Sequence, residues 1–145
     1  AYYGRGPVEN YSDRHASAFL GYYETDVKSQ YWPYIRPQES GNHTDVRWWG
    51  VYDGATGCGL KFYGPDPLEM ASLPYLTADL DGGVVKDAQQ MHSGDLQPRP
   101  FTVVHIAQRQ MGLGCIDSWG SWPDAAYLIP YADHSYTFVI EPYAH

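Results

Sequence analysis

A stretch rich in glycine and tryptophan lies near the C-terminal end of the chain and reads Gln110-Met111-Gly112-Leu113-Gly114-Cys115-Ile116-Asp117-Ser118-Trp119-Gly120-Ser121-Trp122-Pro123. It follows an apolar run, Thr102–Ala107, that predicts a β-strand. Closely spaced glycines indicate a backbone that bends or takes positive φ, which bulkier residues avoid. A tryptophan in such a bend is aimed by the backbone around it. Its flat apolar face, with an N–H at the edge, suits the C–H face of a sugar ring.

Residue type alone favours a simpler interpretation, in which Trp119 and Trp122 fill the end of a β-sandwich core. Large aromatic side chains are highly buried on average. The two interpretations predict opposite surroundings for Trp119, because a sugar-stacking ring faces outward whereas a core-filling ring lies under other side chains.

Size and composition restrict the class of protein. The 145 residues fit one domain, residues 1–145, which can bury a sizeable core. The 14 tyrosines, 5 tryptophans, 15 glycines and 11 prolines are typical of a β-rich domain with many turns. A net charge of −8 argues against nucleic acid or an anionic membrane as a partner. No apolar run approaches the ~20 residues of a membrane span.

Hydrophobic patterning predicts several strands. A hairpin is expected from Val46–Tyr52 and Gly59–Tyr63, joined by the turn residues 53–57. Alternation in its first strand places Val46, Trp48 and Tyr52 on one face, and Arg47 and Trp49 on the other. An extended aromatic run is expected over Val27–Arg36. Further strands are predicted at Leu68–Leu73, Thr102–Ala107, Tyr127–Pro130 and Ser135–Glu141.

Glycine and proline mark the breaks between these elements. They predict a turn-rich beginning over residues 1–14 and a stop at residues 64–67. One helix is expected over Thr77–His92, with Thr77 as its N-cap, but Gly82 and Gly83 shorten or break it. The predicted fold is therefore all-β, an antiparallel β-sandwich with one short helix.

Individual side chains suggest structural roles. Core candidates are Phe19, Leu20, Tyr22 and Tyr23. Glu9, Asp13 and Arg14 are expected to share a local ion-pair network that is structural rather than catalytic. Cys58 and Cys115 cannot form a zinc site alone and are expected to be buried free thiols. The histidines are expected on the surface or at caps, because they show no i, i+2 or i, i+4 pairing typical of ligands; they are His15, His43, His92, His105, His134 and His145.

Three long motifs occur in order along the chain, and together they resemble one family. The first is Gly4-Arg5-Gly6-Pro7-Val8-Glu9-Asn10-Tyr11-Ser12-Asp13-Arg14. The second is Tyr31-Trp32-Pro33-Tyr34-Ile35-Arg36-Pro37-Gln38-Glu39-Ser40-Gly41-Asn42, followed by Asp45-Val46-Arg47-Trp48. With the third motif, residues 110–123, they are similar to the last domain of the large β-galactosidases of glycoside hydrolase family two. Two positions depart from that pattern: Ala107 replaces a usual Asp, and Cys115 replaces a usual glycine.

The resemblance implies an architecture and partners. The family's last domain is a galactose-mutarotase-like supersandwich about twice this length, so the chain corresponds to its C-terminal half and to a piece of a longer polypeptide. A half-sandwich leaves sheet edges unpaired and core exposed. We therefore expect it to pack against the remaining domains of the parent enzyme or against a second copy, as a homo-oligomer. The sequence does not indicate the compartment.

The resemblance also implies a function. The parent enzyme would hydrolyse terminal β-D-galactosides with retention, using two glutamates in a separate β/α barrel. The family's Mg and Na sites lie in that barrel too, so no catalytic residue, metal ligand or cofactor is expected in this chain. The module would support the barrel and contribute Trp119, stacked on the sugar. Asp117 and Ser118 would hold the loop, and Trp122 is expected to be structural.

Two other functions remain open from the residues. One is a stand-alone carbohydrate-binding module that uses Trp119, Trp122, Trp48 or Trp49 as a platform. The other is a structural or oligomerisation domain without a ligand. Glu39, Asp45, Asp53 and Asp117 are candidates for the paired carboxyl groups of glycoside hydrolysis, but their spacing does not show that any two converge.

Overall fold

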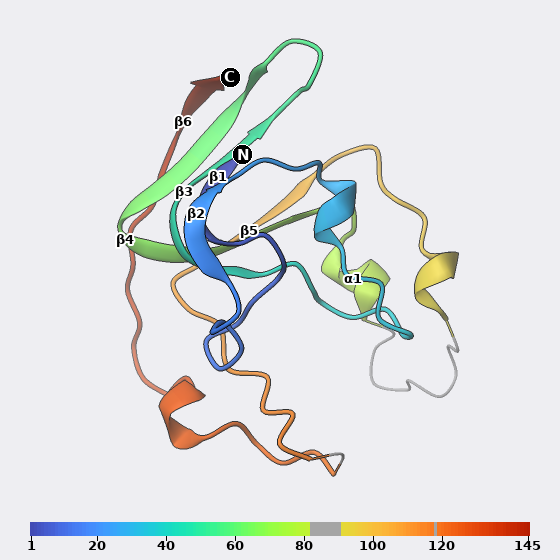
Figure 1. The fold of residues 1–145 in the computed structure, drawn as a ribbon, viewed down its shortest axis with the longest axis vertical. Coiled ribbons are helices and arrows are strands. Elements are labelled where there is room, and N and C mark those ends of the chain that lie inside the picture. The colour runs from blue at the N-terminus through green and yellow to red at the C-terminus, as the bar shows by residue number, and fades with distance from the viewer. Residues whose placement is uncertain (82–90, 118) are drawn as a thin grey trace.

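One antiparallel sheet dominates the computed structural model, which describes residues 1–81, 91–117 and 119–145. Its strand order is β2-β1-β3-β4-β5, and β6 also pairs with β4 (Figure 1). The strands are β1 (Tyr2–Gly6), β2 (Phe19–Tyr23), β3 (His43–Tyr52), β4 (Cys58–Leu73), β5 (Val103–Ala107) and β6 (Val139–Ala144). Helical residues are confined to α1 (Thr77–Leu80) and the 3-10 turns η1 (Lys28–Gln30), η3 (Ser93–Asp95) and η4 (Ala125–Tyr127) among the described residues. The predicted all-β class is confirmed, and the curved sheet is consistent with a sandwich-like fold.

Strand β4 is the central element because it pairs with three other strands. Its first half, Cys58–Tyr63, lies between β3 and β6, and its second half, Glu69–Leu73, pairs with β5. The predicted stop at residues 64–67 is wrong: the strand continues through them with a sharp bend (Figure 1). Pro65 and Pro67 fall in this bend, between the two paired halves, where their missing N–H breaks no ladder pair.

A bulged strand builds the core. The β3–β4 register shifts on both sides of Val46, and Asp45 before it has φ 54°. This irregularity overturns the predicted alternation, since Val46 and Trp49 now enter the same core. The main apolar cluster consists of Tyr2, Val46, Trp49, Phe62, Leu68 and Met70. Trp49 is buried there, with its Nε1 donating to Ser72 Oγ at 2.8 Å, so it is not a sugar platform.

The beginning of the chain is more regular than predicted. β1 extends from Tyr2 to Gly6 and pairs with β2 and β3, so the glycines there do not break the strand. Gly4 instead lies against β3, where an added Cβ would come within 2.9 Å of Val46 Cγ2. Its partner β2 is an edge strand, and Phe19, Leu20 and Tyr22 are exposed rather than buried. Of the four core candidates, Tyr23 alone packs against the core cluster.

Several other expectations need correction. The last strand begins at Val139, and residues 127–130 and 135–138 are outside strands. The aromatic run over Val27–Arg36 contains η1 and bends instead of a strand. α1 begins at Thr77 as predicted and ends at Leu80, before Gly82 and Gly83, and residues 82–90 of the predicted helix lie outside the described part of the chain. Cys58 and Cys115 are free as expected, but both are exposed.

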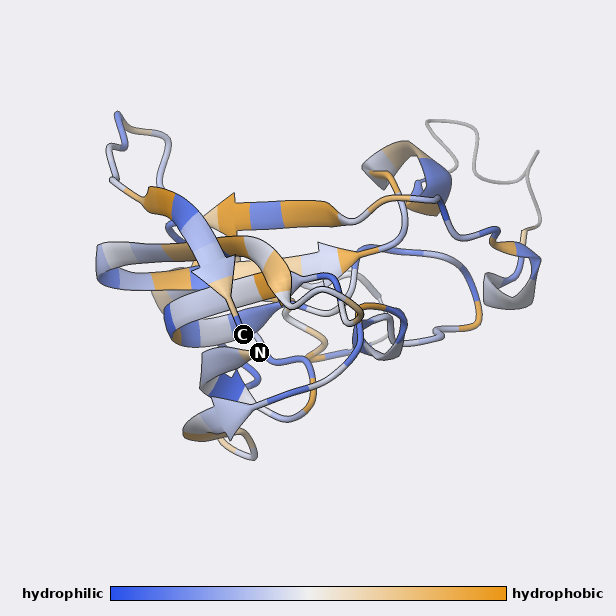
Figure 2. Ribbon diagram, turned by 90° about the horizontal axis from the view of Figure 1, so that it is seen from above, coloured by the Kyte–Doolittle hydropathy of each residue, from blue (hydrophilic) through white to orange (hydrophobic). Residues whose placement is uncertain are grey.

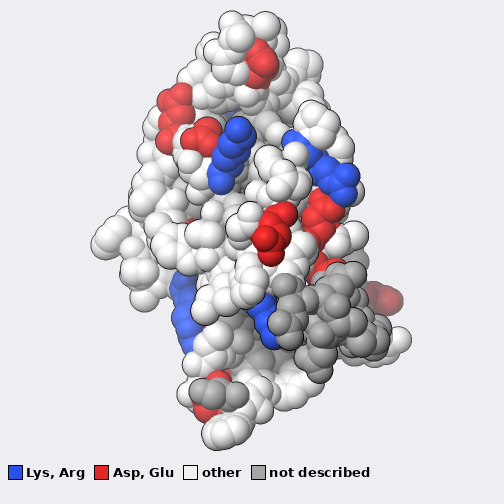
Figure 3. Space-filling view, turned by 90° about the vertical axis from the view of Figure 1, so that its right-hand side faces the viewer, with Lys and Arg blue, Asp and Glu red and all other residues white. Residues whose placement is uncertain are grey.

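The surface mixes apolar and charged groups. Hydrophobic and hydrophilic residues are interspersed along the ribbon (Figure 2), and several large apolar side chains are exposed, including Phe19 and Tyr131. On the face in Figure 3, acidic and basic side chains are interspersed rather than gathered by sign. In the part of the chain that the structure describes, no helix is long and apolar enough to cross a membrane.

Candidate functional site

The tryptophan loop, residues 110–123, leaves the sheet after β5 and extends away from it (Figure 1). Its first residues, 110–114, form a root that contacts the rest of the chain, and residues 115–123 form a tip. The root is held by residues that are distant in sequence, whereas the tip is shaped by contacts within the loop.

The first motif grips the root from a distance of a hundred residues in sequence. Asp13 Oδ1 accepts a hydrogen bond from Leu113 N at 3.0 Å, and Asp13 Oδ2 accepts one from Gly114 N at 2.9 Å. Arg14 Nη2 donates to the carbonyl oxygen of Gly114. The Asp13 side chain is only 4% exposed. Burial raises its pKa, but the two backbone donors, with Arg14 nearby, hold the pKa below its usual value.

A second contact ties the root to the sheet. Glu69 Oε2, on β4, accepts hydrogen bonds from Gln110 N at 3.1 Å and from Asn42 Nδ2 at 3.0 Å. Gln110 Nε2 in turn donates to Asn42 Oδ1 at 3.0 Å. Burial raises the pKa of Glu69, and the hydrogen bonds from Asn42 and Gln110 partly offset that rise. The buried carboxyl therefore anchors the first residue of the loop to the middle of the fold.

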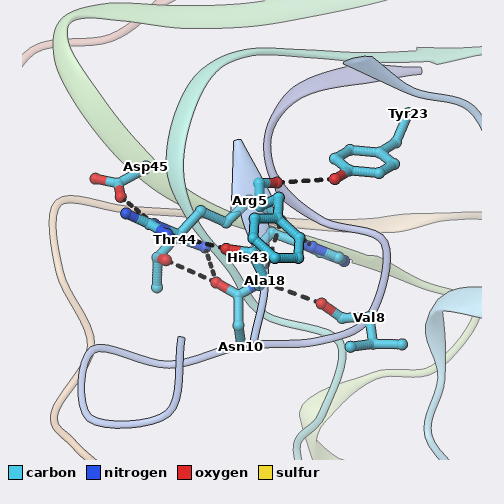
Figure 4. Close-up of polar contacts among 9 residues, drawn as sticks. Arg5, Val8, Asn10, Ala18, Tyr23, His43, Thr44 and Asp45 are labelled. Atoms are coloured by element: carbon cyan, nitrogen blue, oxygen red, sulfur yellow. Dashed lines mark hydrogen bonds and ion pairs between the residues drawn. The ribbon is translucent and has the colours of Figure 1, made fainter. Parts of the chain in front are cut away.

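Asn10 joins the first motif to the second, because its backbone N–H donates to Asn42 O at 2.7 Å. Its Oδ1 accepts hydrogen bonds from both Thr44 N and Thr44 Oγ1, at 2.9 and 2.6 Å (Figure 4). Its Nδ2 donates to the carbonyl oxygens of Arg5 and Val8. Arg5 Nε lies 2.5 Å from Asp45 Oδ2 in the same view.

His43 lies beneath this junction and is buried, contrary to the surface or cap position predicted for it. Its Nδ1 is 2.8 Å from Arg5 O, and its Nε2 is 2.7 Å from Gln30 Oε1. Its ring also packs against Tyr2 and Trp49. Burial lowers the pKa of His43 to about 4, so the ring is neutral near pH 7.

Glu9 completes the connection between motifs. It accepts hydrogen bonds from Tyr34 Oη and from Gly41 N, both in the second motif, as well as from Tyr11 Oη. The predicted local network is therefore only partly right. Arg14 and Asp13 do pair, at 3.7 Å, but Glu9 and Asp13 serve different distant segments. All three sequence motifs meet at this junction.

Local contacts shape the tip. Asp117 Oδ1 accepts from Trp119 N at 2.8 Å, and Asp117 Oδ2 accepts from Ser121 Oγ at 2.5 Å. The Ser121 hydroxyl, together with these backbone donors, lowers the pKa of Asp117. Cys115 has φ 53°, so it keeps the left-handed backbone that a glycine would adopt freely at this position. Ser118, the third predicted site residue, lies outside the described residues.

The tip presents its tryptophans to solvent. Trp119 is 91% exposed and Trp122 is 73% exposed. Trp119 therefore does not fill the core of this chain. Trp122 lacks the burial that its predicted structural role would require.

Each of the four candidate carboxylates contacts a different partner. Asp45 pairs with Arg5, and Asp53 caps the β3–β4 turn by accepting from the backbone N–H groups of Ala55 and Thr56. Asp117 holds the loop tip, and Glu39 Oε1 lies 3.5 Å from His105 Nδ1. Across residues 1–81, 91–117 and 119–145, no group of three His, Cys, Asp or Glu side chains could hold a metal ion.

A cleft of about 600 Å³ runs beside the root along β5. Its lining includes Glu39, His105, Arg109, Gln110 and Met111. On the loop, this lining includes Gln110 and Met111 but not Trp119.

The three motifs lie within the region of the chain that matches a known protein family. The family model described as "Beta galactosidase small chain" matches residues 1–140, which include all three. The chain belongs to the β-galactosidase small-chain family. The long-range contacts of Asp13, Asn42 and Glu69 with the loop were not predicted from sequence. Asp13 and Asn42 lie in the first and second motifs, whereas Glu69 lies outside all three.

Individual relatives agree with the family assignment. The β-galactosidase of Priestia megaterium is 38% identical over 143 residues, covering 97% of this chain and 13% of that protein. The β-galactosidase of Streptococcus thermophilus is 35% identical, with 98% and 13% covered. The β-galactosidase small subunit of Latilactobacillus sakei is 33% identical over 131 residues, with 83% of this chain and 39% of that subunit covered. This small-chain family member thus spans 13% of the length of the first two relatives.

Proposed function

We propose that this chain is a non-catalytic, C-terminal module of a β-galactosidase that hydrolyses terminal β-D-galactosides with retention. The module supports the catalytic barrel and contributes Trp119 to the sugar pocket. The barrel supplies the two reactive carboxyl groups and the family's Mg and Na sites.

One observation carries the proposal: Trp119 is 91% exposed at the tip of a loop whose root is fixed by buried polar contacts. An indole ring so placed loses contact with water at little cost in ordering when a sugar stacks on it, because its backbone is already constrained by Asp117. Aromatic stacking contributes about 0.5–1.5 kcal/mol beyond the area buried, which suits a residue that tunes affinity rather than breaks the bond.

Exposed apolar side chains support packing against the remaining domains or a second copy. They lie on the edge strand β2, on the long segment between β5 and β6, and on β6, and include Phe19, Leu20, Ile116, Tyr131 and Ile140. Exposed apolar surface of this extent is typical of protein interfaces. The relatives are much longer than this chain, so the remaining domains of the parent enzyme are the partners that we propose for it.

Steady-state kinetics of the full-length enzyme test the proposal. Trp119→Ala should raise KM for an aryl β-D-galactoside about 2- to 12-fold, the range that 0.5–1.5 kcal/mol represents. The fall in kcat should be smaller. Trp122→Ala is the matched control, an exposed tryptophan on the same loop, and should leave KM within about twofold. An unchanged KM in Trp119→Ala would remove Trp119 from the pocket.

A further inference from the structure

We infer that Asp13 is a positioning residue for sugar stacking: it fixes the direction in which the tryptophan loop leaves the sheet, and thereby sets where Trp119 meets the sugar. The inference rests on the proposed function of Trp119. Its evidence is the geometry of the root.

Asp13 grips the loop immediately before it turns. Its two carboxylate oxygens bind the N–H groups of consecutive residues, Leu113 and Gly114. The next turn uses two left-handed residues in a row, Gly114 with φ 72° and Cys115 with φ 53°. Since the tip begins at this turn, the orientation of the two bound peptide groups sets the orientation of everything that follows.

The fit between Asp13 and the loop is close. A Cβ added at Gly112 would lie 2.7 Å from Asp13 Oδ2 and 2.7 Å from Tyr127 Cβ. Gly112 N also donates to Tyr127 O at 2.9 Å, so the loop backbone is held from its far side as well. The root is therefore clamped between the first motif and the η4 turn, and the clamp requires glycine at position 112.

The chemistry of the clamp requires a carboxylate. An ionised carboxyl group only accepts hydrogen bonds and so satisfies both N–H groups. Asparagine keeps the shape but presents an NH₂ group to one of them, so it loses one bond and leaves a donor unsatisfied. Alanine loses both. Hydrogen bonds to an ionised acceptor are roughly twice as strong as those between neutral groups, which suits a contact that must fix the orientation of the whole loop.

Trp119 itself lies in the tip, five residues beyond Gly114, the second residue that Asp13 binds. The bonds described in the tip are all local, from Trp119 and Ser121 to Asp117 and from Cys115 Sγ to the carbonyl oxygen of Leu113, so the tip follows the root when the root moves. Groups that meet a substrate need supporting contacts that hold their geometry closely. Asp13 provides such support although it is far from the indole in sequence and does not touch the sugar.

A double-mutant cycle in the full-length enzyme tests this role. Asp13→Asn and Asp13→Ala are each measured with Trp119 present and with Trp119→Ala. If Asp13 acts through Trp119, Asp13→Ala raises KM by no more than Trp119→Ala does, about 2- to 12-fold, and has little further effect in the Trp119→Ala background. Asp13→Asn should give a smaller rise, because one of the two bonds survives. Asp66→Asn, an exposed aspartate in the β4 bend, is the control and should change nothing.

Hydrogen exchange provides a readout that does not depend on sugar binding. Asp13→Ala should accelerate exchange of the Leu113 and Gly114 amides about tenfold, as expected for the loss of hydrogen bonds to a charged acceptor. Unchanged exchange there, or an equal rise in KM in both tryptophan backgrounds, overturns the inference while the proposed function stands. An unchanged KM in Trp119→Ala overturns the proposed function and, with it, the role of Asp13 in stacking. Asp13→Asn keeps the shape of the buried side chain, so the test survives if Asp13→Ala fails to fold.

Discussion

The root and the tip of the tryptophan loop are adjacent in sequence but are held by opposite means. Residues 110–114 bind side chains from the first motif, from Asn42 and from β4, over sequence distances of 41 to 101 residues. Residues 115–123 are shaped by Asp117, which reaches only two to four residues along the chain. The root thus ties the loop to the sheet while the tip leaves the Trp119 ring exposed.

The comparison also separates buried carboxylates from an exposed one. Asp13 and Glu69 lie under the root as acceptors for backbone N–H groups, where an unpaired carboxyl group would be costly. Asp117 accepts similar bonds in full contact with solvent, where the bonds are weak but direct the local turn. Perturbing the first set should loosen the loop as a whole, whereas perturbing the second should alter only the ring.

The largest effect that we expect is the loss of stability in acid, when the buried His43 beneath the root becomes protonated. The pKa of His43 is about 4 in the fold against 6.5 when unfolded, so the unfolded chain binds a proton in this interval that the folded chain does not. The contribution of His43 to stability is therefore fully present above pH 6.5 and falls by about 3 kcal/mol as the pH approaches 4.

Hydrogen exchange of β3 and the root between pH 7 and pH 4.5 measures this effect, after correction for the intrinsic rates. Protection should fall in the wild type. His43→Gln, which cannot be protonated, should show a flatter profile even if it is less stable at pH 7. The pKa of Asp117 is lowered, so its contacts in the tip persist over the same range. Equal loss of protection in both proteins would contradict the assignment to His43.

Two glycines give a matched comparison of intermediate size. Gly112→Ala forces a Cβ against Asp13 and Tyr127 in the root and should cost about 1–3 kcal/mol. Gly120→Ala meets no atom within 4 Å in the tip and should cost about 1 kcal/mol through its φ of 81° alone. Exchange at Leu113 and Gly114 should accelerate in the first variant and stay unchanged in the second. A larger loss of stability in Gly120→Ala than in Gly112→Ala would mean that Asp13 and Tyr127 do not hold the root closely.

The smallest expected effect lies in the tip. Asp117→Ala removes the bonds to Trp119 N and Ser121 Oγ and should raise KM about twofold, the low end of what one hydrogen bond contributes. Exchange at the root should stay at wild-type rates. Ser121→Ala, which keeps the bond from Trp119 N, should have a still smaller effect on KM. A change in root protection in either variant would show that root and tip are coupled.

Much of the fold could be predicted from local pattern. The hairpin between β3 and β4, the strand β5 and the glycine-bent loop after it follow from apolar runs and turn residues within a few positions of one another. The alternation in β3 failed because a bulge at Val46 turns Trp49 into the core. The exposed strand β2 was mistaken for core because aromatic composition does not show whether another element covers a strand.

The amino-acid sequence alone established the all-β class, the family through three motifs, and a glycine-bent turn before Trp119. The three-dimensional fold was needed to show that Trp119 is exposed and how the motifs contact one another: Asp13 and Arg14 bind Gly114, Asn42 bridges Asn10 and Glu69, and His43 is buried beneath them. The physical reason is range. Backbone bends are chosen by neighbouring residues, whereas a buried polar group finds its partner wherever folding brings an N–H within 3 Å, and here that partner is a hundred residues away.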